Sequence, residues 1–122
     1  MHVESDFSNY PCEGFTPNIP SLNIGTVKKM KDHLRFMGSC RVTPNVEQKT
    51  YEGWMQQINE TCMEVGASFR IVDYKSAFAT AKESDIMQAA EKAYEQVYGT
   101  SPMMSKTSVC TEASVFHRLG VE

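Results

Sequence analysis

The sequence predicts an α+β fold with a small antiparallel sheet and two main helices. Residues 33–43 alternate apolar and polar side chains, which is the pattern of a half-buried strand. Apolar residues between 51 and 65 recur at steps of three and four, which is the pattern of an amphipathic helix. Because both patterns occur within 122 residues, we expect one small mixed domain or a large part of one.

The N-terminal half is predicted to begin with a hairpin. Residues 1–20 are interrupted by proline and glycine, so we expect an irregular lead-in that lies on the surface of another element. Residues 22–27 form a short strand candidate, and residues 33–43 form its partner. Gly38 falls within the apolar series of the second strand, where it predicts a bulge or a close approach of two backbones.

A helix is expected between Asn45, a candidate N-cap with Gln48 three residues on, and Gly66, a candidate C′ residue. Its apolar stripe, which we expect in the core, consists of Tyr51, Trp54, Met55, Ile58, Cys62 and Val65. A third strand is predicted over residues 67–74, with Phe69 facing one side and Arg70 the other.

The C-terminal half is predicted to be mostly helical. A second helix begins at a capping box over residues 80–83 or at Ser84, and Gly99 ends it. Its apolar stripe consists of Ile86, Ala90, Ala93, Tyr94 and Val97. Residues 105–122 hold a short strand-like piece and a short helix near 111–119.

The order β-β-α-β matches the last four elements of a split β-α-β, or ferredoxin-like, unit without its first strand and helix. That first strand normally lies in the middle of the sheet, so the sheet here has a gap or an exposed edge. Since an unpaired edge recruits another strand, we expect a homodimer or a higher oligomer joined through strand edges near residues 22–27 or 34–42.

Composition narrows the classes of function. Lys and Arg number 12 against 15 Asp and Glu, so a net charge of −3 gives no support to nucleic-acid binding. No apolar run approaches the length of a membrane span, and the N-terminus lacks an export signal, which favours the cytoplasm. The cysteines at 12, 40, 62 and 110 form no Cys-x-x-Cys pair, so we expect reduced thiols.

Three segments resemble a known enzyme family. Residues 15–27 read FTPNIPSLNIGTV, similar to the F-x-P-x-x-P-T-L-N-x-G-T stretch of the acetylornithine deacetylase and succinyl-diaminopimelate desuccinylase family. Residues 38–44, with Arg41 shortly before Pro44, resemble the following strand of that family's lid domain. Residues 111–121 are similar to its T-D/E-A-x-x-F-x-x-x-G-I stretch.

The resemblance implies a fragment of a zinc-dependent amidohydrolase or exopeptidase, related to aminoacylase and carboxypeptidase G, that hydrolyses N-acyl amino acids or small peptides. It divides the chain into a lead-in at 1–20, a partial lid or dimerisation domain at 21–78, and a segment of the catalytic domain at 79–122. By resemblance, Arg41 contacts the substrate carboxylate and Glu112 helps to place substrate. The alternatives are that Arg41 is a solvent-exposed strand residue that pairs with a surface glutamate, and that Glu112 is an ordinary glutamate in the first turn of a helix.

The metal site is not expected in this chain. The family's zinc (or cobalt) ligands lie in segments before the lid and after the last motif, and His2, His33 and His117 show no ligand spacing. The family's Gly-Gly is replaced by Lys28-Lys29 in the hairpin. The chain alone is therefore expected to be inactive, with no catalytic residue of its own. The alternative is a stand-alone α+β interaction or dimerisation module.

Overall fold

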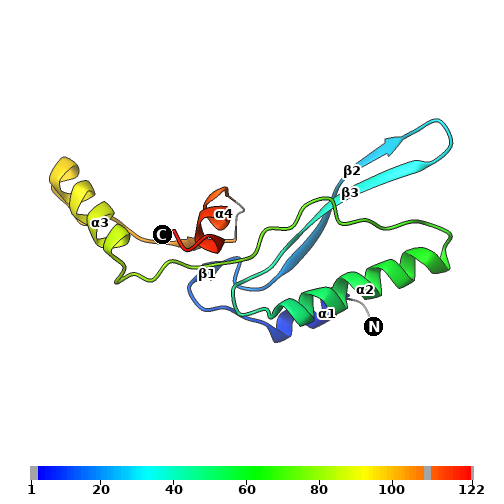
Figure 1. Cartoon of the computed structure of the whole chain (residues 1–122), viewed down its shortest axis with the longest axis horizontal. Helices are drawn as coiled ribbons and strands as arrows, with labels where there is room; N and C mark the ends of the chain where they lie inside the picture. The colour runs from blue at the N-terminus through cyan, green and yellow to red at the C-terminus, as the bar shows by residue number, and fades with distance from the viewer. Residues whose placement is uncertain (1–2, 109–110, 122) are drawn as a thin grey trace.

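The computed structural model describes residues 3–108 and 111–121, and it confirms a mixed α+β chain (Figure 1). His2 and Cys110 lie outside the described residues. The elements are α1 (Val3–Asp6), the 3₁₀ helix η1 (Phe7–Asn9), β1 (Phe15–Thr16), β2 (Ser21–Lys29), β3 (Leu34–Arg41), α2 (Gln48–Glu64), α3 (Asp85–Tyr98), β4 (Lys106–Thr107) and α4 (Ala113–Arg118). The molecule is elongated, with the hairpin tip and α3 at opposite ends.

The predicted hairpin is confirmed. Strands β2 and β3 pair antiparallel from Ser21 opposite Arg41 to Lys29 opposite Leu34, with a register shift between Ile24 and Thr26. Gly38 marks a close approach of the two backbones, because a Cβ placed there would lie 2.6 Å from the carbonyl oxygen of Asn23. The absence of a side chain at residue 38 therefore lets the strands meet at this point.

Helix α2 is also confirmed, but its predicted N-cap is wrong. Glu47 occupies the N-cap position and makes no capping hydrogen bond through its side chain. Asn45 instead donates from Nδ2 to the carbonyl oxygen of Pro11 at 2.9 Å, and its Oδ1 accepts from Thr43 Oγ1 at 2.6 Å. Its amide thus ties the loop before α2 to the N-terminal segment. Gly66 adopts a φ of +70° directly after the helix, as predicted.

The N-terminal segment differs from the predicted irregular lead-in. Elements α1 and η1 cover α2, and Phe7 joins Trp54 and Met55 as the buried apolar residues of the described chain. The ring of Phe7 stands edge-on to Trp54 with centroids 4.8 Å apart. The segment orders because the indole of Trp54 offers a large apolar surface that gains by leaving water.

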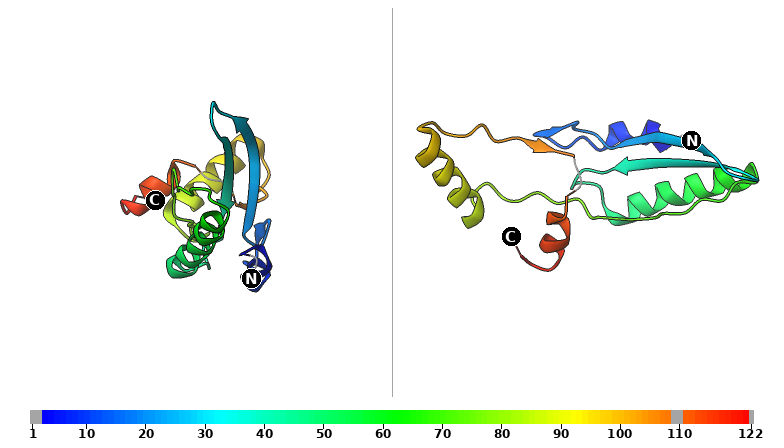
Figure 2. Two further views of the ribbon diagram at one scale, coloured as in Figure 1. Left: turned by 90° about the vertical axis from the view of Figure 1, so that its right-hand side faces the viewer. Right: turned by 90° about the horizontal axis from the view of Figure 1, so that it is seen from above.

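The predicted strand over residues 67–74 is wrong, since residues 67–80 form no strand. This segment runs along the β3 side of the hairpin and in the same direction as β3 (Figure 2). A strand requires a neighbour that accepts and donates backbone hydrogen bonds. In the split β-α-β order that neighbour would be the central strand, which the described residues do not supply.

Helix α3 is confirmed, with Ser84 at the N-cap position and Gly99 in the left-handed conformation after its last residue. An amphipathic helix normally buries its apolar stripe, but the stripe of α3 is exposed. Ile86 is 49% exposed and Val97 is 74% exposed. No other element covers this face within the described residues. The predicted strand-like piece and final helix are present as β4, which pairs in parallel with β1, and as α4.

Cys12, Cys40 and Cys62 are free thiols, and each is partly buried. Within the described ranges, none of the helices has both the length and the apolar character needed to cross a membrane.

Candidate functional site

A groove of about 930 Å³ separates the hairpin from residues 68–78. Residues 36–42 of the β3 region form one wall, and residues 68–78 form the other. Helix α2 contributes four side chains to the lining, and these are Tyr51, Met55, Ile58 and Cys62. The groove therefore combines an apolar helix face with two stretches of extended backbone.

Strand geometry assigns the faces of β3. Cys40 and Val42 pack against the core around Trp54 and Met55, so the even-numbered residues face α2. Arg41 lies between them in the sequence and belongs to the opposite face, because side chains alternate along a strand. Arg41 lines the groove and is exposed.

Two titratable groups that line the groove, the Cys40 thiol on β3 and the Tyr51 hydroxyl on α2, remain neutral near pH 7. Burial raises the pKa of the Cys40 thiol, so the thiolate that acts as a nucleophile is disfavoured. The pKa of Tyr51 is raised as well, first by burial and then by its neighbours Cys40 and Tyr74. The rings of Tyr51 and Tyr74 stack with centroids 4.8 Å apart, and this contact ties residues 67–78 to α2. These groups shape the groove and offer no activated nucleophile.

Arg41 makes no ion pair with any described residue. The ion pair seen among the described residues joins His33 to Asp32. Its guanidinium can therefore receive a carboxylate in a two-point hydrogen-bonded contact. The alternative, a surface pair with a glutamate, is not formed by the described residues.

Glu112, the other predicted site residue, is exposed and occupies the N-cap position of α4 without a capping hydrogen bond from its side chain. It is not part of the groove lining, although Thr111 and Ser114 on either side of it are. Ser114 is buried and donates from Oγ to the carbonyl oxygen of Thr111 at 3.0 Å. The structure thus brings Arg41 and the start of α4 to one groove but leaves Glu112 at its margin.

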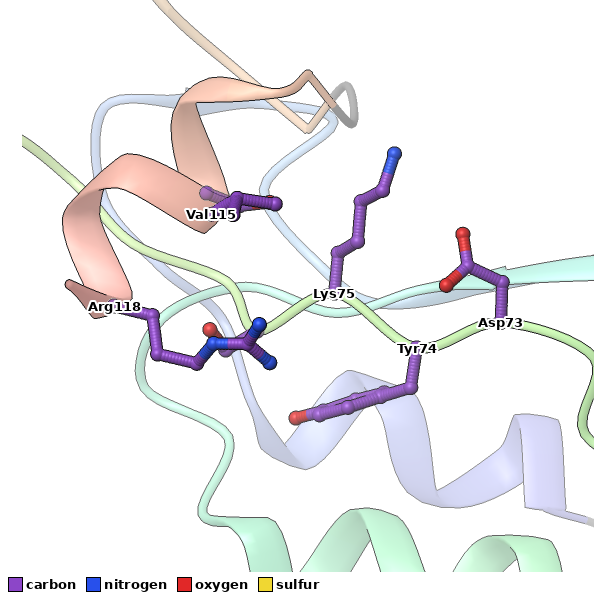
Figure 3. A pocket seen from close by; sticks show the side chains of 7 residues that line it. Asp73, Tyr74, Lys75, Val115 and Arg118 are labelled. Carbon is purple, nitrogen blue, oxygen red and sulfur yellow. The ribbon is translucent and has the colours of Figure 1, made fainter.

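A smaller pocket of about 190 Å³ lies between α4 and residues 73–76 (Figure 3). Arg118 extends from α4 toward that segment, and Lys75 projects beside Val115. His117 stacks on Phe78 with centroids 4.7 Å apart, which holds α4 against the segment. The sequence does not single out Lys75 or Arg118, because only the contact between distant segments brings the two cations together.

The described residues do not fit a zinc ion. They contain no group of three or more histidine, cysteine, aspartate or glutamate side chains placed to hold a metal, whereas a protein zinc site draws on three or four such ligands. No chemical step is therefore assigned to a metal bound by this part of the chain.

The start of the first motif pairs with β4, which precedes the last motif in the sequence. Phe15 and Thr16 of β1 pair with Lys106 and Thr107 of β4 in parallel, shortly before the motif that starts at Thr111. Ser108 Oγ donates to the carbonyl oxygen of Pro17 at 3.0 Å. Comparison of the chain with protein-family models, curated proteins and solved structures finds no match.

Proposed function

We propose that this chain supplies the lid and dimerisation surface of a cytoplasmic zinc-dependent amidohydrolase or exopeptidase that acts on N-acyl amino acids or small peptides. The fold proposed for it is a ferredoxin-like unit without its central strand, of which the described residues form the hairpin and α2. The observation that carries the proposal is the position of Arg41, which lines an open groove together with the start of α4. Zinc (or cobalt) would be held by other segments of the enzyme.

The lining of the groove suits this class of substrate. An N-acyl amino acid carries an apolar or weakly polar acyl chain at one end and a carboxylate at the other. Apolar side chains that line the groove would contact the acyl chain, while the Arg41 guanidinium would bind the carboxylate through two hydrogen bonds. Glu112 directly follows the lining residue Thr111 and would help to place the substrate from the α4 side.

Nuclear magnetic resonance (NMR) titration with N-acetylornithine tests the role of Arg41. The matched ligand is the same compound with its carboxyl group converted to an amide. We expect shifts around Arg41 with the acid alone, and we expect Arg41→Gln to abolish them while Arg35→Gln does not. Equal shifts with acid and amide would contradict the carboxylate contact. Turnover of N-acetylornithine by this chain alone would contradict the fragment interpretation.

An interaction or dimerisation module without catalysis is the second candidate. The exposed apolar side chains of the hairpin favour it, since Ile24 is 65% exposed and Phe36 is 60% exposed. Both candidates share the expectation of a homodimer or a higher oligomer joined through strand edges near residues 22–27 or 34–42, of which the outer edge of β2 is the one proposed. Light scattering at tens of micromolar protein should give at least twice the mass of 13.7 kDa. A monomer with a cooperative thermal transition would contradict that assembly.

A further inference from the structure

We infer that the groove between β3 and residues 68–78 binds an extended β-strand of another polypeptide, whose side chains alternate between apolar and acidic. This inference goes beyond the proposed lid role and does not depend on it.

Backbone groups that have no partner among the described residues are the first observation. Strand β3 pairs only with β2 in the described chain, so its second edge has no neighbouring strand. Across the groove, residues 68–80 take part in no hydrogen bond with any described residue. Such extended backbone can be satisfied by water or by a further strand, and exposed strand edges readily accept an added peptide strand.

The direction of the two walls is the second observation. Strand β3 and residues 67–78 run the same way on the two sides of the groove (Figure 2). A single strand placed between them in the opposite direction would form antiparallel ladders with both walls. One incoming strand could therefore satisfy both rows of backbone groups, which favours a strand over a helix as the ligand.

The apolar half of the ligand pattern follows from α2. One face of an inserted strand would meet the groove-lining residues Tyr51, Met55 and Ile58, because α2 lies on that side of the hairpin. Side chains on a strand alternate between faces, so every second residue of the ligand should be apolar. The remaining residues would share the face on which Arg41 lies.

The acidic half follows from the charges that line the groove. The lining includes three basic side chains, Arg41, Arg70 and Lys75, and one acidic side chain, Asp73. None of these four forms an ion pair with a described residue. The groove is thus locally basic in a chain whose net charge is −3. Glutamate or aspartate on the ligand would complement these cations, and cross-strand pairs of opposite charge stabilise a sheet.

The same charges disfavour a second copy of this chain as the occupant. Every charged side chain within β2 and β3 is basic, and these are Lys28, Lys29, Arg35 and Arg41. Either strand of a second copy would add positive charge to a basic groove, and like charges placed opposite one another destabilise strand pairing. A strand from a different polypeptide is therefore the better match.

Fluorescence anisotropy of the full chain with labelled seven-residue peptides tests the inference. The probe has the sequence Thr-Val-Glu-Val-Glu-Val-Thr, and its partner carries lysine in place of glutamate. A third peptide keeps the glutamates but has N-methylated backbone amides, which cannot donate to a strand. We expect saturable binding of the first peptide alone. Equal binding of the N-methylated peptide would show mere apolar adhesion and overturn strand addition.

Variants of the chain locate the site and separate it from the proposed carboxylate contact. Arg70→Glu should weaken binding of the glutamate peptide by about fivefold or more, since it replaces an attractive exposed charge by a repulsive one. Arg35→Glu is the matched control, because Arg35 lies on β3 outside the groove lining, and it should leave the affinity within about twofold. Equal losses in both variants would overturn the assignment to the groove. Dissociation of an oligomer by the peptide would assign the groove to a second copy and overturn the inference as well.

Discussion

Trp54 connects the N-terminal segment to the helix that carries the groove. Its side chain is 2% exposed, and its indole Nε1 donates to Asp6 Oδ2 at 2.8 Å. Phe7 and Tyr10 both stand edge-on to the indole ring. Trp54 therefore makes one hydrogen bond and two aromatic contacts with Asp6, Phe7 and Tyr10, which lie more than forty positions earlier in the chain.

We expect Trp54→Ala to lower the free energy of unfolding by about 3–5 kcal/mol, because it removes a large buried ring and leaves a cavity. The control is Val65→Ala, which changes a side chain that is 76% exposed at the end of the same apolar stripe. That control should change the stability by less than about 0.5 kcal/mol. Urea unfolding followed by circular dichroism measures both, and similar midpoints would show that the stripe does not form the core.

The hydrogen bond between Trp54 and Asp6 predicts a pH dependence. The indole N–H, followed by the amide of Asn9, lowers the pKa of Asp6 below its usual 3.8 in the folded chain. A lowered folded-state pKa contributes stability at pH values well above 3.8, and this contribution is lost as the pH falls through the lower folded value. Asp6→Asn should therefore melt below the unchanged chain at pH 7, with a difference that shrinks toward pH 2.5. A difference that stays constant across this range would contradict the assignment.

At the scale of elements, two glycines serve opposite purposes. Gly38 lies where a side chain would collide with the Asn23 carbonyl oxygen of the opposite strand, whereas nothing lies within 4 Å of a Cβ built at Gly53 in α2. Gly38 is needed for the approach of two strands. Gly53 merely weakens its helix, since glycine is a poor helix former.

Replacing each glycine by alanine separates these roles. Gly38→Ala should destabilise the chain by roughly 1–3 kcal/mol, because the backbone of β2 must move to accommodate the new methyl group. Gly53→Ala should stabilise it by about 0.5–1 kcal/mol through helix propensity. Guanidinium unfolding of both variants gives the comparison. Stabilisation by both substitutions would show that the hairpin is not closely packed at residue 38.

Elements whose stability is local could be predicted from the sequence. The hairpin, α2 and α3 each show a clear periodicity and a turn or glycine at one end, and all three are present. Residues 67–74 show the same strand-like alternation but form no strand, because a strand depends on a neighbour that their own sequence cannot specify. The α1–η1 segment shows no periodicity, and its apolar side chains pack against a core cluster that includes Trp54 and Met55.

The residues of the candidate site also divide into those that could be predicted from the sequence and those that could not. The family resemblance singles out Arg41, and the strand alternation predicts that it lies on the polar face of the hairpin. Lys75 and Arg118 could not, since they meet only where α4 lies against residues 73–76. The position of Glu112 at the helix start was evident from the sequence, but its place outside the groove lining depends on how α4 is oriented.

At the scale of the whole molecule, the chain buries little apolar surface for its size. Phe36 and Met37 on β3 are 60% and 52% exposed, and Val97 on α3 is 74% exposed. Exposed apolar side chains on several elements are typical of surfaces that meet further polypeptide. Along the open groove, backbone groups on both walls lack a partner among the described residues.

Backbone amide hydrogen exchange along β3, followed by NMR, tests the open sheet most directly. In an antiparallel pair, alternate amides point toward the neighbouring strand, so every second amide of Leu34–Arg41 should exchange slowly and the others fast. Addition of the peptide Thr-Val-Glu-Val-Glu-Val-Thr should slow exchange at the fast amides of β3 and at the amides of residues 68–78 together. Uniformly slow exchange along β3 and residues 68–78 without peptide would contradict the open sheet, because it would mean that both walls are already paired.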